Sequence, residues 1–202
     1  DTHRLHASGV VEKGDDTEFP GGKIRPTEYD RTAWGLGYGL SAGDHELGLE
    51  YSRNETTDSG TPALPMDIRF IDTNTIGGKY IGTFGGTSLT ARLNYKDVEH
   101  WMDNFTLSAP PPDPARYRQN LAKGDGTGFE LSALSGFRSG KFEYGIDGDL
   151  SNHESRITNP NNAMFFVEAF NDVKRDRVGL FGEWSTPIDD TCRTRSADAI
   201  PK

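Results

Sequence analysis

The strongest constraint on the fold is a strict alternation of large apolar side chains with small or polar ones. In AWGLGYGL the large residues fall on every second position, and HELGLEYS repeats the pattern after a short SAGD segment. The same alternation recurs in KYIGTF, SLTARLNY, GFELSALSGF, KFEYGIDGDL and RVGLFGEW. A period of two places successive side chains on opposite sides of a β-strand. With THRLHASGVV as the first strand, the pattern predicts about eight strands, each with one apolar and one polar face.

The connections between these strands alternate in length. Short turns at SAGD, GGT, RSG and TPIDD take turns with long polar segments, which lie roughly at residues 12–30, 53–74, 101–127 and 152–176. Loops of this length are uncommon in a compact soluble sandwich. Short turns at one end and long loops at the other are typical of outer-membrane β-barrels.

The composition agrees with a barrel whose apolar side chains face lipid. The 202-residue chain is only 33% hydrophobic, with a mean hydropathy of -0.68, yet it carries 11 Phe, 7 Tyr and 3 Trp. A soluble core needs more apolar material, and a disordered chain carries fewer aromatic rings. We therefore predict an all-β fold in the bacterial outer membrane, with an antiparallel transmembrane β-barrel domain over residues 1–190 and an irregular tail over 191–202.

Several classes of function are unexpected for this chain. A net charge of -9 without a basic patch argues against a nucleic-acid partner. No run of about 18 apolar residues is present, so no transmembrane helix is expected. No Ser-His-Asp or Cys-His arrangement has a context that supports catalysis, and we expect neither an enzymatic function nor a catalytic cofactor.

The strand count leaves two architectures open. One is a complete eight-stranded barrel with an adhesive or structural role, closed between the first strand and the strand at Val178. The other is a segment of a larger barrel. The second is favoured because the stretch after Trp184 lacks an alternating final strand with an aromatic end, and because the N-terminus starts directly in a strand.

The segment VEHWMDNF carries the most specific chemistry in the sequence. It places His100 and Met102 two residues apart, a spacing that puts both side chains on one face of a strand. On the strand from Ser88 the odd positions are apolar, so both residues should continue the inward-facing polar row of Arg92, Asn94 and Lys96. Asp97, Glu99 and Trp101 should point the other way. A membrane strand needs about 9 to 11 residues to cross, which puts His100 at the external mouth of the barrel.

The ligand chemistry of this pair is consistent with copper. Thioether sulfur is a soft ligand that favours Cu(I), and imidazole binds copper in either oxidation state. Two ligands alone do not hold an ion tightly, and methionine is also a common packing residue. Met66 is a further candidate metal contact, although a buried loop anchor is the simpler interpretation of it. The other histidines show no metal-ligand spacing to one another: His3, His6, His45 and His153.

Two segments resemble TonB-dependent outer-membrane receptors of the copper-receptor type. They are TPALPMDIRFIDT, Thr61 to Thr73, and DVEHWMDNF, Asp97 to Phe105. The resemblance implies a barrel of about 22 strands closed by an N-terminal plug domain, of which this chain would form the early strands. It also implies that His100 and Met102 supply half of a copper site, with copper as the transported ligand.

The resemblance also identifies what the chain lacks. The family's other two copper ligands lie in a Cys-x-x-x-Met motif of the plug, whereas Cys192 is followed by RTRS. The resemblance implies three partners: the missing plug, the TonB complex that acts through it, and outer-membrane lipid. A receptor for a siderophore or another metal chelate is the alternative within the same family, and its binding would survive the loss of Met102.

Overall fold

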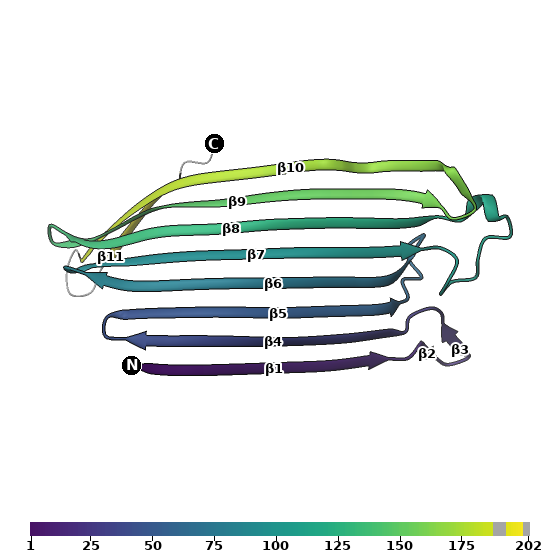
Figure 1. Cartoon of the computed structure of the whole chain (residues 1–202), viewed down its shortest axis with the longest axis horizontal. Helices are drawn as coiled ribbons and strands as arrows, with labels where there is room; N and C mark the ends of the chain where they lie inside the picture. The colour runs from purple at the N-terminus through teal and green to yellow at the C-terminus, as the bar shows by residue number, and fades with distance from the viewer. Residues whose placement is uncertain (188–192, 200–202) are drawn as a thin grey trace.

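The chain forms one antiparallel sheet of nine long strands in which each strand pairs with the next along the chain (Figure 1). The computed structural model describes residues 1–187 and 193–199, the second range by its backbone only. The strands of the sheet are β1 (Thr2–Gly14), β4 (Tyr29–Ala42), β5 (His45–Ser59), β6 (Asp67–Phe84), β7 (Thr87–Asp103), β8 (Gln119–Phe137), β9 (Gly140–Asn159), β10 (Asn162–Pro187) and β11 (Arg193–Ala199). Two short strands, β2 (Thr17–Phe19) and β3 (Gly22–Ile24), form a separate hairpin, and a 3₁₀ turn, η1, spans Pro114–Arg116. Within the described residues, no helix is long and apolar enough to cross a membrane.

Tight hairpins join the strands at one end of the sheet, which we call the turn end; it lies at the left in Figure 1. Gly43, with φ 57°, turns β4 into β5, and Gly85 and Gly86, with φ 54° and 87°, turn β6 into β7. Two-residue hairpin loops need positive φ, which glycine adopts without steric cost. The predicted turns at SAGD and GGT are therefore confirmed, as is the turn at RSG, where β8 ends at Phe137, β9 begins at Gly140 and Arg138 has a φ of 55°. The turn at TPIDD runs past Pro187 and lies outside the described residues.

The strands are longer than the sequence pattern predicts. Residues 53–59 and 67–74 belong to β5 and β6, and the segment predicted as a loop over 152–176 is almost entirely β9 and β10, joined at residues 160–161. The predicted loops shrink to 15–28, 60–66, 104–118 and 160–161, at the opposite, loop end of the sheet. The prediction failed because the strict alternation of apolar and polar residues stops there, in the polar run at residues 53–59 and in the apolar run at residues 163–167, while strand pairing continues.

Two further predictions need correction. The irregular tail predicted over 191–202 contains β11, which pairs with β10 from Phe181 to Pro187; residues 191–192 and 200–202 lie outside the described residues. The closed eight-stranded barrel required β1 to pair with the strand at Val178. Among the described residues β1 pairs with β4 alone, and β10 pairs with β9 and β11. A tail without strong alternation can still add to a sheet, because the neighbouring strand supplies the hydrogen-bonding template.

The register sorts side chains into an apolar face and a polar face. Residues directly opposite one another in paired strands share a face, and Leu36, Tyr51, Ile76 and Tyr95 form one such row on the apolar face. From β5 to β9 the next row toward the loop end is polar and consists of Arg53, Asn74, Asp97, Asp125 and Asn152, with Trp34 of β4 beside Arg53. We call the apolar side chains on the turn-end side of this polar row the apolar band. On β7 the band covers Leu89 to Tyr95.

The apolar band is exposed rather than buried. Leu36 is 56% exposed, Leu93 59% and Leu180 73%, whereas Ala133 is the only buried side chain of the band in the described residues. Trp34 packs edge-on against Tyr51 where the band ends, at 5.2 Å between ring centroids. A soluble domain would bury such a face. An exposed apolar band that ends in aromatic rings is typical of a membrane β-barrel.

Candidate functional site

His100 and Met102 lie on the polar face of β7, beyond the apolar band and close to the loop end. His100 pairs with Ile71 on β6 and Ala122 on β8, and Met102 pairs with Asn120 on β8. The pairing of β7 with β8 is continuous from Ser88 to Asp103. The single irregularity of the β6–β7 pair lies between Ile68 and Phe70 on β6, so it inserts no residue into β7. The parity expected from the sequence is therefore kept along β7.

The polar face of β8 beside these residues carries almost no side chains. Ala122, Gly124, Gly126 and Gly128 occupy its successive same-face positions. We call this row the glycine trough. Side chains from both neighbouring strands lie above it: Asn94 of β7 covers Gly128, and His153 of β9 covers Gly124. A hydrogen bond of 2.9 Å from Ser155 Oγ to Asn120 Oδ1 spans β9 and β8 at the loop end of the trough.

A cavity of about 880 Å³ follows the trough. Its lining includes His100, Met102, Val98 and Lys96 from β7, and His153 and Ser155 from β9. The sequence does not single out His153, because the polar segment SNHES predicts a loop. The sequence does contain one signal for this arrangement. In AKGDGTG every second residue is small, at Ala122, Gly124, Gly126 and Gly128, which leaves space above the strand for a side chain from a neighbouring strand.

The imidazole of His100 is partly buried and lacks a polar partner. Its Nε2 is one of two buried side-chain nitrogen or oxygen atoms without a hydrogen bond in the described part of the chain; the other is Asn152 Oδ1 on the opposite face. An unpaired buried polar atom costs about 1 to 3 kcal/mol. Burial also lowers the pKa of His100 below its usual range, which favours the neutral imidazole that binds metal ions.

Asp103, the residue after Met102, anchors the loop that follows. Its side chain is 1% exposed, and Oδ1 accepts hydrogen bonds from the backbone N–H groups of Phe105 (3.0 Å) and Thr106 (2.8 Å). Oδ2 accepts a hydrogen bond of 2.6 Å from Thr106 Oγ1. Asp67, equally buried and paired with Asp103, accepts hydrogen bonds from Thr61 N and Ser108 N. These contacts order the backbone around Met102.

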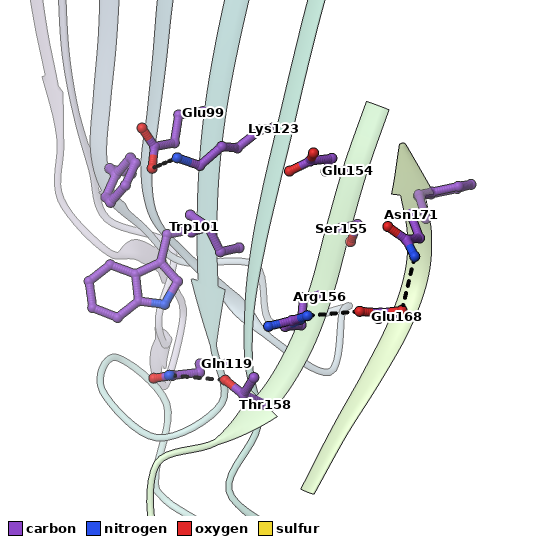
Figure 2. Close-up of a pocket in the computed structure, with 13 residues that line it drawn as sticks. Glu99, Trp101, Gln119, Lys123, Glu154, Ser155, Arg156, Thr158, Glu168 and Asn171 are labelled. Atoms are coloured by element: carbon purple, nitrogen blue, oxygen red, sulfur yellow. Dashed lines mark hydrogen bonds and ion pairs between the residues drawn. The ribbon is translucent and has the colours of Figure 1, made fainter. Parts of the chain in front are cut away.

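The opposite face of the same strands holds a second cavity, of about 690 Å³ (Figure 2). Glu99 and Trp101 line it, as their parity on β7 predicts, and Lys123 Nζ lies 3.4 Å from Glu99 Oε1. Arg156 Nη2 lies 2.7 Å from Glu168 Oε1. Figure 2 shows these two ion pairs across neighbouring strands, and the lining contains no histidine, cysteine or methionine, so this cavity offers no soft ligand set.

The remaining metal candidates do not join His100 and Met102. Met66 lies in the loop before β6, where its carbonyl accepts a hydrogen bond of 2.7 Å from Thr61 Oγ1, and its side chain is not part of the cavity lining. Cys192 lies outside the described residues. No group of three or more His, Cys, Asp or Glu side chains in the described residues is placed to hold a metal ion.

These features define a class: an antiparallel segment of an outer-membrane type of β-barrel, with a polar face that gathers histidine and methionine beyond its apolar band. A solved structure with the same fold is that of the copper transporter OprC, which this chain matches with a TM-score of 0.78 and 19% sequence identity over 94% of its own length. The chain spans 30% of that protein. No family model and no curated protein matches the sequence.

Proposed function

We propose that this chain is part of a TonB-dependent outer-membrane receptor that captures and imports copper, with His100 and Met102 as barrel ligands of the metal. The observation that carries the proposal is their juxtaposition on one face of β7, next to a trough without side chains and beyond the apolar band. An imidazole nitrogen without a hydrogen-bonding partner and a thioether two residues away form a soft pair suited to Cu(I).

The two faces of the sheet give this function its physical basis. The apolar band would face lipid, the polar face would line the barrel interior, and the loop end would be extracellular. Copper arriving from outside would then meet His100 and Met102 before it reaches the interior. The likeness in fold to a copper transporter supports this cargo at the level of the fold.

Other parts of the receptor would complete the process. A barrel in lipid has no unpaired strand edges, so further strands must pair with β1 and with the free edge of β10. A plug domain would supply the remaining copper ligands and would move under force delivered by the TonB complex. In this proposal the barrel segment binds and positions the ion, and no enzymatic step is assigned to it.

Replacing each ligand in the full-length protein tests the proposal. Cu(I) affinity is measured by competition with a chromophoric chelator for the wild type and for the His100→Ala and Met102→Ala variants, each first checked for folding. Both variants should lose a single tight site. A receptor for a copper chelate or siderophore would instead keep its affinity for the chelate in Met102→Ala, and that result would replace copper as the cargo.

A further inference from the structure

We propose that His153 of β9 reaches across the glycine trough and acts as a third ligand to the ion held by His100 and Met102. The inference rests on the proposed function, because it adds a ligand to the same site. It assigns the site two imidazole nitrogens and one thioether sulfur, contributed by two strands that are not hydrogen-bonded to each other.

The register brings the two histidines within reach of one ion. His153 lies opposite Gly124, and His100 lies opposite Ala122, one same-face step along β8. Neighbouring strands are about 4.8 Å apart, so the backbones of β7 and β9 are separated by about 10 Å. An imidazole from each side spans half of that distance, and only Ala122 and Gly124 lie between them.

The His153 ring already occupies the trough. A Cβ atom placed on Gly124 would lie 3.1 Å from His153 Nδ1 and 3.6 Å from Cε1, so the imidazole lies over the β8 backbone. Its ring nitrogens have no side-chain or backbone partner within the described residues, whereas the Nδ1 atoms of His3 and His45 each lie within 2.9 Å of a tyrosine hydroxyl. His153 therefore lies near His100 and Met102, and its ring nitrogens are available to bind an ion.

The immediate neighbours of His153 favour a soft ion over a hard one. Val98 of β7 and Val173 of β10 flank His153 along the row through Gly124, and both line the cavity. A nitrogen and thioether set with apolar neighbours suits Cu(I) or Ag(I), whereas Mg²⁺ or Ca²⁺ would require a cage of oxygen ligands.

The first test counts ligands directly. X-ray absorption at the copper edge of the Cu(I)-loaded full-length protein reports the nitrogen and sulfur neighbours of the ion, and chelator competition reports its affinity. His153→Ala should remove one nitrogen neighbour and weaken Cu(I) binding by at least about tenfold, the loss typical of removing a group that supports a metal site. His6→Ala replaces another polar-face histidine, on β1, and should change neither measurement.

A second variant tests the trough without touching a ligand. Gly124→Val places a side chain where the His153 ring lies, so it should lower Cu(I) affinity as much as His153→Ala does. Gly48→Val is the matched control on the same face, because a Cβ there meets only Lys79 O, at 3.9 Å.

The outcomes separate the two proposals. Loss of affinity in His100→Ala and Met102→Ala with unchanged affinity and ligand number in His153→Ala would overturn the role of His153 and leave the proposed function standing. Unchanged affinity in all three variants would overturn both.

Discussion

At the scale of single residues, side chains at odd and at even positions of β7 meet different surroundings. Leu93 projects from the exposed apolar band opposite Phe129, whereas Thr90, on the same strand, lies on the polar face opposite Ser132. If the apolar band contacts lipid, a charged side chain should destabilise the protein at an odd position of this strand and be tolerated at an even one. The same parity puts His100 and Met102 on one face and Trp101 on the other.

A charged substitution on each face tests this assignment. Leu93→Arg should reduce the free energy of unfolding by about 2 to 4 kcal/mol, because it places a guanidinium in the hydrocarbon region. Thr90→Arg adds the same side chain to the polar face and should change stability by well under half as much. Denaturant titration of the full-length protein in lipid vesicles measures both. Equal losses in the two variants would refute a lipid-facing apolar band.

The sequence could predict the parity of β7 because nothing interrupts its pairing with β8. Alternation from Ser88 onward therefore extends correctly to His100 and Met102. The approach of His153 could not be predicted in the same way, since it depends on which residue of β9 faces Gly124. That register is set by the hairpin between β8 and β9 and by pairing over the whole length of both strands.

At the scale of elements, the strands continue beyond the apolar band through polar contacts. Arg53 contacts Glu55 at 2.8 Å and Asp72 at 3.2 Å, and Tyr51 OH donates a hydrogen bond of 2.9 Å to Asn74 Oδ1. The sequence loses its period of two in this region, while the backbone ladder persists. For this reason the sequence predicts the strands correctly within the band but ends them too early at the loop end.

The β7–β8 loop gives a prediction at this scale. Asp103→Ala removes the acceptor of two backbone N–H groups and one hydroxyl in a buried position, so the loop over residues 104–118 should open more often. Amide hydrogen exchange of Phe105 and Thr106 should accelerate at least about tenfold, which corresponds to about 1.4 kcal/mol.

Two comparisons make this exchange experiment specific. Asp103→Asn keeps a side-chain oxygen that can accept from the backbone, so it should show a smaller acceleration. Amides of the apolar band, such as that of Leu93, should exchange at the wild-type rate in both variants. Unchanged exchange at Phe105 in Asp103→Ala would show that the carboxylate does not order the loop.

At the scale of the whole molecule, the sheet has two edges that the described residues leave open. The outer edge of β1 has no partner strand, and β11 covers β10 only from Phe181 to Pro187. Unpaired strand edges are templates for association. The 202-residue chain on its own should therefore self-associate in detergent, whereas the full-length protein should not. Light scattering after size-exclusion chromatography distinguishes the two, and a monodisperse monomer of the isolated chain would contradict this expectation.

The central claim is that the polar face of β7 binds copper, and Cu(I) titration of the full-length protein with a competing chelator tests it most directly. The account predicts one tight site in the wild type that is lost in both His100→Ala and Met102→Ala while the fold is retained. Wild-type affinity in both variants would contradict it, and His100 and Met102 would then be ordinary polar-face residues of a barrel with another cargo.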